Sequence, residues 1–141
     1  MATTTIPDDH RDLLDEPIIA VLTTLMPDGQ PQMSLVWADY DGEFVRLSTA
    51  LDRQKSRNMQ RDPRVTLFVL DPANSSRWIE VRACVERITE DGAIALADKL
   101  AHDYTGQEHF YGGVYPAERQ GQETRVVVYL RPTRVNVCAV H

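Results

Sequence analysis

The 141-residue sequence contains few cysteines and no long apolar segment. Cys84 and Cys138 lie far apart in apolar stretches without CxxC spacing, which excludes a cysteine metal framework and indicates buried, reduced thiols. The longest apolar stretches, 18–25 and 65–70, are much shorter than the roughly 20 residues that a membrane-spanning helix needs. The N-terminal residues also lack the basic and apolar regions of a secretory signal. These absences predict a cytoplasmic protein without a membrane span.

The motifs of several enzyme classes are also missing. The chain contains no Gly-x-Ser-x-Gly elbow, no cysteine with an evident histidine base, and no GxGxxG or GxxxxGK phosphate loop. Its histidines show none of the spacings typical of metal ligands, so we predict no metal site. They are His10, His102, His109 and His141. If the protein is an enzyme, a bound cofactor must supply its chemistry.

The charge balance excludes one class of partner. The net charge is -6 at pH 7 and the isoelectric point is about 5.1. Proteins that bind nucleic acids instead present clustered lysine and arginine on a generally basic surface. We therefore predict no nucleic-acid partner and expect a small molecule as the substrate.

What the sequence does contain is typical of one globular domain. Hydrophobic residues make up 43% of the chain and charged residues 26%, which is close to the average of globular proteins. No internal repeat or linker divides the sequence, and its length suits one domain with one core. We predict a single domain over residues 1–141.

Most of the chain has the composition and alternation of β-strands. Turn residues at 27–29 and 41–42 indicate hairpins, and Pro132 indicates a bend or an edge position. The pattern predicts about six antiparallel strands. The strand-like stretches are 18–25, 32–40, 43–49, 65–70, 77–89, 124–130 and 135–140.

Three short helices are expected between the strands, over residues 8–14, 53–61 and 91–104. The second of them is expected to begin after Asp52, a candidate N-cap. The long segment 106–122 is predicted to be a functional or mobile loop. Because helices and strands do not alternate as βαβ units, the fold class is mostly β, and a closed antiparallel barrel is favoured.

Basic residues gather in one segment of this acidic protein, between residues 52 and 64. They are Arg53, Lys55, Arg57, Arg61 and Arg64. The strand that ends at Ser48-Thr49 leads into this helix, so hydroxyl groups, a helix N-terminus and cationic side chains lie close together. That combination predicts a phosphate site. The alternative is a solvated basic helix face.

Two further features have more than one interpretation. Gln32, Ser34 and Val36 share one face of a predicted strand, and their side chains point either to water or into a groove. Trp78 begins a strand, where it either stacks on a planar ligand or packs at an interface. Trp37, Trp78, Phe110 and Tyr111 fall outside the core alternation, which predicts an apolar patch that a second copy of the chain covers.

Taken in order, the motifs of the chain resemble the pyridoxamine-phosphate-oxidase-like split β-barrel superfamily, and most of all its branch that uses the deazaflavin coenzyme F-420. The resemblance is good over residues 14–90 and holds only in outline for the C-terminal third. It rests on D-G-x-P at 28–31, S-T-A followed by R-x-K-x-x-N at 48–58, R-D-P-R at 61–64 and E-V-R at 80–82. The resemblance implies a split barrel that binds a cofactor.

The same resemblance implies a homodimer with two cofactor clefts at the subunit interface. Five residues would hold the phosphate and ribityl side of the cofactor: Ser48, Thr49, Arg53, Lys55 and Asn58. Three more would flank the ring: Gln32, Ser34 and Val36. Trp78 would reach the cleft from the partner subunit.

The function implied is hydride transfer between reduced coenzyme F-420 and an unsaturated small organic substrate, with a proton from water, Tyr104 or Tyr111. FMN is the alternative cofactor, although the chain lacks the Arg-x-x-Leu-Lys sequence of the FMN-dependent oxidases. A non-catalytic carrier of flavin or haem is the other alternative. Haem would call for an axial histidine, and none is expected in the cleft.

Overall fold

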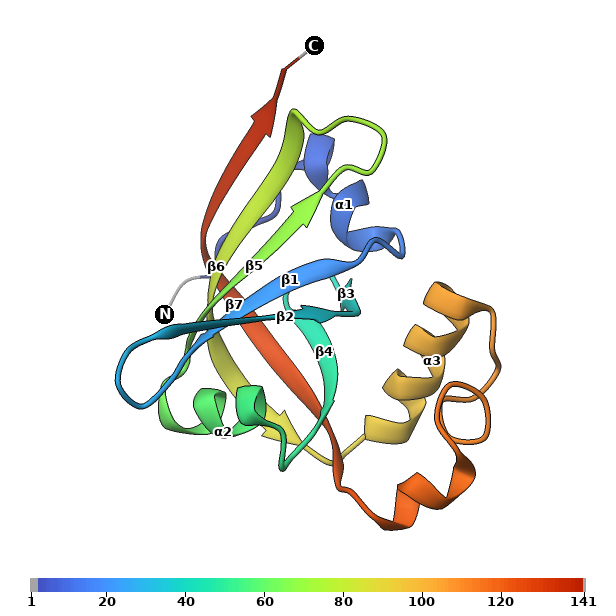
Figure 1. Ribbon diagram of the computed structural model, residues 1–141. Helices are drawn as coiled ribbons and strands as arrows, with labels where there is room; N and C mark the ends of the chain where they lie inside the picture. The colour runs from blue at the N-terminus through green and yellow to red at the C-terminus, as the bar shows by residue number, and fades with distance from the viewer. Residues whose placement is uncertain (1–2, 141) are drawn as a thin grey trace.

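The computed structural model describes residues 3–140, which form one antiparallel sheet with short helices around it (Figure 1). The strands are β1 (Ala20–Leu25), β2 (Pro31–Val36), β3 (Ala38–Tyr40), β4 (Val45–Ala50), β5 (Arg64–Leu70), β6 (Arg77–Thr89) and β7 (Arg125–Ala139). The α-helices are α1 (Asp12–Asp15), α2 (Gln54–Arg61) and α3 (Ala93–Thr105). Two 3-10 helices are η1 (Asp8–His10) and η2 (Ala117–Gly121).

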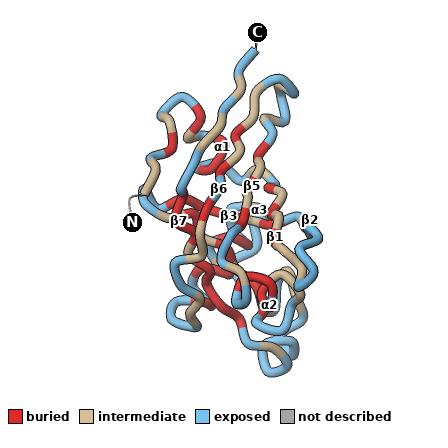
Figure 2. The backbone as a smooth tube through the Cα atoms, turned by 90° about the vertical axis from the view of Figure 1, so that its left-hand side faces the viewer, coloured by how far each residue is buried: buried red, intermediate tan, exposed pale blue. Residues whose placement is uncertain are grey.

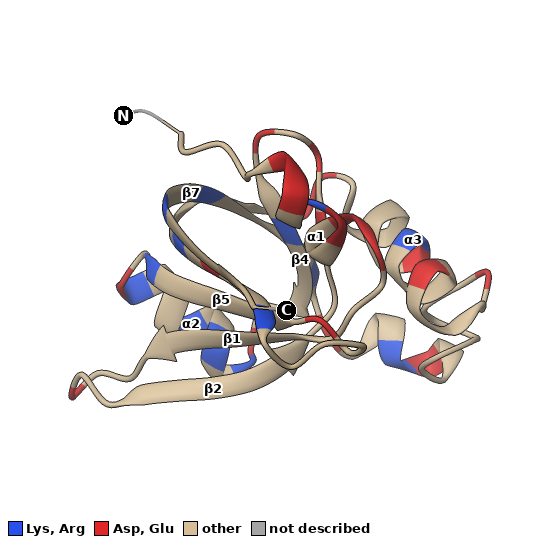
Figure 3. Ribbon diagram, turned by 90° about the horizontal axis from the view of Figure 1, so that it is seen from above, with Lys and Arg blue, Asp and Glu red and all other residues tan. Residues whose placement is uncertain are grey.

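The sheet curls into a split barrel because of its strand order, β2-β1-β5-β6-β7-β4-β3. Strands β2 and β3 lie at opposite edges, yet only Trp37 separates them in the chain. The sheet must therefore bend until its edges approach, and Figure 3 shows the curled sheet from above. Among the described residues no ladder joins β2 to β3. The barrel is therefore open between these strands, whereas the strand pattern of the sequence had favoured a closed barrel.

The hydrophobic core fills the inside of the curled sheet (Figure 2). Alternate residues of β1 are buried, as the period of a strand with one inward face requires. Strand β7 differs, because residues 126–128 are buried without alternation. Val126 and Val128 belong to the barrel core, whereas Val127 packs against Leu96 and Leu100 of α3. Helix α3 therefore covers the outer face of the barrel at β7.

The mostly-β fold with three α-helices is confirmed, but the sheet has seven strands and not about six. The predicted strand 32–40 is divided at Trp37 into β2 and β3. In contrast, β7 runs without interruption through Pro132. The ladder shifts register by one residue at this position, where Pro132 pairs with Ala83. Such a bulge accommodates a residue that has no N–H to donate to the ladder.

The helix bounds differ from the predicted ones in detail. The leading segment 8–14 forms η1 and then α1, whose Leu13 and Leu14 are buried. Helix α2 begins at Gln54 and has no side-chain cap, so the prediction that Asp52 caps it is wrong. Helix α3 ends at Thr105 and is followed by its C-cap Gly106, which has φ of 80°. Segment 106–122 is not structureless, because it contains η2.

The two cysteines are more exposed than the sequence predicted. Cys84 and Cys138 are free but only partly buried, so the prediction of full burial is wrong. Cys84 lies within β6, directly after the buried Ala83, whereas Cys138 lies near the C-terminal end of β7. Within residues 3–140, none of the helices has the length and apolar character that crossing a membrane requires.

Candidate functional site

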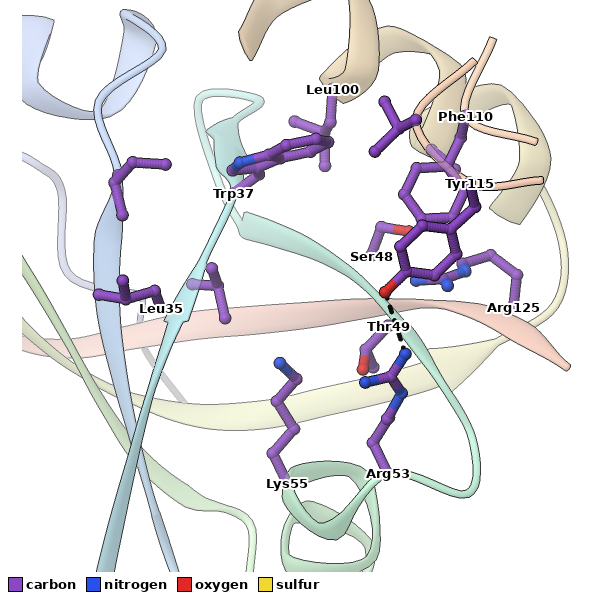
Figure 4. Close-up of a pocket in the computed structure, with 14 residues that line it drawn as sticks. Leu35, Trp37, Ser48, Thr49, Arg53, Lys55, Leu100, Phe110, Tyr115 and Arg125 are labelled. Carbon is purple, nitrogen blue, oxygen red and sulfur yellow. Dashed lines mark hydrogen bonds between the residues drawn. The ribbon is translucent and has the colours of Figure 1, made fainter. Parts of the chain in front are cut away.

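A pocket of about 280 Å³ lies where β2, β4, α2, α3 and segment 106–122 meet (Figure 4). Cationic and hydroxyl side chains line one part of it and apolar or aromatic side chains line the other. The lining residues are Ile19, Leu35, Val36, Trp37, Ser48, Thr49, Arg53, Lys55, Ala97, Leu100, Phe110, Val114, Tyr115 and Arg125.

Two cations enter the pocket from the start of α2. In Figure 4 the side chains of Arg53 and Lys55 both extend from this helix into the pocket. Arg53 donates a hydrogen bond to the Tyr115 hydroxyl over 3.1 Å. Lys55 is partly buried and makes no hydrogen bond or ion pair among the described residues. Burial and the neighbouring guanidinium groups of Arg53 and Arg125 lower the pKa of Lys55.

The position of these cations follows from the local chain geometry. Strand β4 ends at Ala50, and the buried Ser56 hydroxyl donates to the Ala50 carbonyl over 2.7 Å, which holds α2 against the strand end. The first N–H groups of a helix have no partner within the helix. They therefore add partial positive charge beside Arg53 and Lys55.

The remaining basic residues of segment 52–64 do not line the pocket. Arg57 donates to the Gln54 side chain over 2.6 Å and to the Asp52 carbonyl. Arg61 donates to the Leu25 carbonyl, and Arg64 forms an ion pair with Asp62 over 2.7 Å. Charges of opposite sign also lie in different parts of the fold. Figure 3 shows lysine and arginine at α2 and acidic residues at α1, so the positive charge is concentrated near the pocket.

Two consecutive hydroxyl side chains on β4 contribute to different parts of the pocket. Thr49 lies on the side of Arg53 and Lys55, whereas Ser48 lies on the side of Phe110 (Figure 4). The Ser48 oxygen is buried and has no hydrogen-bond partner within residues 3–140. A buried polar group without a partner costs free energy. Because Ser48 lines the pocket, its hydroxyl is a candidate to bind a ligand there.

The apolar part of the pocket lies beneath α3. The Trp37 ring stacks on Tyr104 of α3 with centroids 5.2 Å apart and planes at 13°. Phe110 packs against Tyr115 with centroids 4.6 Å apart, and it contacts Ala97 in a cluster between α3 and segment 106–122. These contacts fix a flat apolar wall opposite α2, which suits a planar ring system.

A buried ion pair supports segment 106–122. Arg125 pairs with Glu123, and their side chains are 7% and 5% exposed. The Arg125 guanidinium lies 4.4 Å from the centroid of the Phe110 ring. Burial alone raises the pKa of Glu123, but hydrogen bonds from Tyr111 and Arg125 outweigh this effect and hold the pKa below its ordinary value. The pair therefore remains ionised and keeps the aromatic residues in place.

Five of the nine predicted cofactor residues line this pocket: Val36, Ser48, Thr49, Arg53 and Lys55. Two others lie behind it. The fully buried Asn58 amide donates to the Thr24 hydroxyl over 3.0 Å and to the Gln32 carbonyl oxygen over 3.1 Å. This network fixes α2 against β1 and β2. Ser34 lies on the same face of β2 as Gln32 and Val36 but is not among the lining residues.

Trp78 and the candidate proton donors lie away from the pocket of their own chain. Trp78 packs against Phe68 with centroids 5.5 Å apart. The Tyr104 hydroxyl donates to the Ile18 carbonyl over 3.0 Å, and burial raises its pKa. The Tyr111 hydroxyl donates to Glu123 over 2.6 Å. Tyr115, in contrast to Tyr104 and Tyr111, lines the pocket.

The sequence reasoning missed several lining residues, including Arg125, Tyr115 and Leu100. Arg125 begins the apolar run of β7, where a charged residue between Thr124 and Val126 was a usable signal for a buried, functional cation. The sequence shows aromatic residues in segment 106–122, but no pattern in a single sequence shows that they contact the start of α2. No group of three or more histidine, cysteine, aspartate or glutamate side chains within residues 3–140 is arranged to hold a metal ion.

Solved structures with low sequence identity share this fold. A conserved hypothetical protein from Mycobacterium tuberculosis, Rv2991, is 24% identical, with a TM-score of 0.73 and coverage of 96% of this chain and 86% of the other. A haem-binding protein from Mycobacterium smegmatis is 21% identical, with a TM-score of 0.60. The alignment with it covers 95% of this chain and 55% of the longer protein.

The family follows from two further comparisons. An F-420 reductase of known structure is 35% identical, with a TM-score of 0.79, and the match covers 93% of this chain and 98% of that one. The family described as pyridoxamine 5'-phosphate oxidase matches residues 6–139. The chain belongs to the pyridoxamine 5'-phosphate oxidase family, as the resemblance of its motifs had predicted.

Proposed function

We propose that the protein is a reductase that uses coenzyme F-420 to transfer a hydride to an unsaturated small organic substrate. The observation that carries this proposal is the pocket itself, which joins the Lys55 ammonium and the Ser48 hydroxyl, neither of which has a partner within residues 3–140, to a flat apolar wall. The 35% identical F-420 reductase supports the choice of cofactor. The family supports oxidoreductase chemistry with a flavin-type group.

The donor set of the pocket fits a cofactor of this kind. Lys55, Arg53 and the first turn of α2 offer positive charge and N–H donors to a phosphate. Thr49 adds a hydroxyl on the same side, whereas Val36 and the Trp37 region offer an apolar surface to a ring. Ser48 is left to donate to a polar atom of the ring or of its side chain. Gln32 and Asn58 would act from behind the pocket wall, and Ser34 would act from the face of β2 that it shares with Gln32 and Val36.

The chemistry of the bound deazaflavin is hydride donation, which the protein directs through position and charge. With the cofactor bound, Trp37 and the apolar side chains beneath α3 would hold the ring and keep water away from it. Tyr115 is placed to hold a proton for the substrate, because its oxygen accepts the hydrogen bond from Arg53 and its own proton remains available. Tyr115 is therefore a better candidate for the proton donor than Tyr104 and Tyr111, whose hydroxyl groups donate to other partners.

FMN remains the second candidate cofactor, because the family as a whole is described by an oxidase activity. A haem carrier has less support. The two ring nitrogens of His10 lie 3.0 Å from their hydrogen-bond acceptors, the Asp9 carboxylate and the Cys138 carbonyl, at the far end of the strands. His102 and His109 are exposed, and neither they nor His10 lines the pocket.

The cofactor proposal predicts that coenzyme F-420 binds at least about tenfold more tightly than FMN, a difference of about 1.4 kcal/mol. Side-by-side titrations that follow the fluorescence of each cofactor would measure the two dissociation constants. Equal affinities, or tighter binding of FMN, would assign the protein to the FMN-dependent oxidases of its family.

We also propose that the protein is a homodimer whose partner subunit contributes its Trp78 to the pocket. The aromatic residues first expected to form the interface are largely covered within the chain. Phe110 is buried, Trp37 stacks on Tyr104, and Trp78 packs against the tilted ring of Phe68. Among the exposed apolar side chains, those beside the pocket lie on β2 and just before β1: Met33 and Leu35 are 67% and 69% exposed, and Ile19 is 47% exposed.

Because β2 is an edge strand beside the pocket, its apolar outer face is the surface that a second copy would cover. Sedimentation equilibrium at micromolar concentration is expected to give twice the chain mass of 16.0 kDa. The Leu35→Glu variant should sediment closer to the mass of one chain. A single species of 16.0 kDa for the unchanged protein would contradict the dimer.

A further inference from the structure

The two lysines of this chain, Lys55 and Lys99, have neighbours of opposite charge. Lys99 on α3 forms ion pairs with Asp103 over 2.7 Å and with Asp39 over 3.1 Å. These contacts raise its pKa even though burial alone lowers it. Lys55 has no such partner among the described residues and faces Arg53 and Arg125 instead. Its amine therefore loses a proton more readily than an ordinary lysine does.

The Lys55 amine is also accessible to a ligand. It projects into the pocket in Figure 4, with the apolar wall of Leu35 and Trp37 across from it. Arg53 retains further N–H donors beyond the single bond to Tyr115. A molecule with a planar ring and an anionic group thus finds an apolar surface, a cation and a nucleophilic nitrogen within one pocket.

We propose that Lys55 is a covalent modification site that forms an imine with aromatic aldehydes carrying an anionic group. The neutral amine attacks the aldehyde carbon, a C–N bond forms, and the carbonyl oxygen leaves as water when the C=N bond is made. The ammonium proton passes to solvent before the attack, and no electrons are transferred. The reaction is reversible, and it blocks the pocket while the imine persists.

The preference for an anionic aldehyde follows from the charges that line the pocket. Arg53 and the first turn of α2 attract an anion to the side of the pocket where Lys55 lies. No aspartate or glutamate is among the lining residues, so no acidic side chain there opposes the anion. The phosphate or carboxylate of the reagent holds its aldehyde beside the amine and raises the effective concentration of the reacting carbon.

Pyridoxal 5'-phosphate is a suitable probe, because it joins an aromatic aldehyde to a phosphate. The full-length protein is incubated with a limiting amount of it, and sodium borohydride then adds hydride to the imine carbon to give a stable secondary amine. Peptide mass spectrometry after trypsin digestion is expected to show the adduct on Lys55 with loss of cleavage at that residue. Lys99 should keep its cleavage and serves as the internal control.

Three comparisons decide the proposal. Pyridoxal, which has the aldehyde but no phosphate, should label Lys55 several-fold more slowly, and inorganic phosphate should slow the labelling by pyridoxal 5'-phosphate. The Lys55→Arg variant keeps the positive charge and should carry no adduct in this region. Equal labelling of Lys55 and Lys99 would overturn the selectivity, and equal rates with pyridoxal would overturn the preference for an anionic aldehyde.

This inference does not depend on the identity of the cofactor, and one further measurement separates the two proposals. If coenzyme F-420 occupies the pocket, it should protect Lys55 from labelling at concentrations near its dissociation constant. Labelling without protection would contradict the proposed cofactor site and leave the imine in place. Tight binding of coenzyme F-420, measured by fluorescence titration, to a protein that forms no adduct on Lys55 would contradict the imine and leave the proposed cofactor site in place.

Discussion

Replacing Lys55 with alanine is expected to weaken the binding of coenzyme F-420 by about 1.5 to 3 kcal/mol, the range for a hydrogen bond to a charged group. The variant removes the one pocket cation that has no partner within the described residues, so a phosphate would lose a direct contact and nothing in the protein would gain one. Folding should hardly change, because the side chain is only partly buried and lies beside two like charges. Fluorescence titration and urea-induced unfolding would measure the two effects.

Arg57→Ala is the matched control for this substitution. Arg57 lies on the same helix, but its guanidinium bonds to Gln54 and to the Asp52 carbonyl and does not line the pocket. Its removal changes the net charge equally and should cost much less binding free energy. If both variants weaken binding by the same amount, diffuse electrostatics and not a direct contact explains the effect. Added salt would then reduce the loss, because diffuse fields are screened over about 8 to 10 Å.

The pH dependence of binding offers a further check on Lys55. A bound phosphate favours the protonated amine, whereas burial and the nearby guanidinium groups lower the pKa of Lys55 in the free protein. Affinity should therefore fall as the pH rises through this lowered pKa, at a lower pH than an ordinary lysine would give. The Lys55→Ala variant should lose that dependence.

The parts of the fold that local patterns specify were predictable from the sequence. The Asp28-Gly29 and Asp41-Gly42 turns form as expected, since Gly29 and Gly42 have φ of 88° and 99°. The alternation of β2 is also evident from the sequence, but the sequence does not show which face of the strand is buried. Met33 and Leu35 are exposed, whereas Gln32 is partly buried by its bond to Asn58.

Contacts between distant segments account for the part of the site that was not predicted. The basic residues at 53 and 55 lie in the first turn of the predicted helix 53–61, so their expected role as phosphate ligands follows from local sequence. Tyr115 reaches Arg53 across 62 positions of sequence, and only the packing of α3 and segment 106–122 on the barrel brings them together. Pro132 was similarly misjudged, because the bulge opposite Ala83 that accommodates it depends on a second strand.

The largest effect on stability is expected for Arg125→Met, which leaves the Glu123 carboxylate buried without its main partner. Removing one member of a buried ion pair typically costs about 3 to 5 kcal/mol. The aromatic residues of segment 106–122 also lose the guanidinium that lies 4.4 Å from Phe110. Urea-induced unfolding would measure the loss. Arg64→Met is the control, since the Arg64 side chain is 77% exposed in its pair with Asp62 and such pairs contribute at most about 1 kcal/mol.

The double variant Glu123→Gln with Arg125→Met tests whether the unpaired charge is the cause. If it is, the double variant should recover much of the stability, because no buried carboxylate remains. The pH dependence gives the same test in the single variant. The pKa of Glu123 is held low in the folded protein, so the stability that the pair contributes is present above the unfolded pKa and is lost as the pH falls through the folded value. The difference between the unchanged protein and Arg125→Met should therefore narrow at acidic pH. A difference that stays constant with pH would instead assign the loss to the stacking of Arg125 on the aromatic rings.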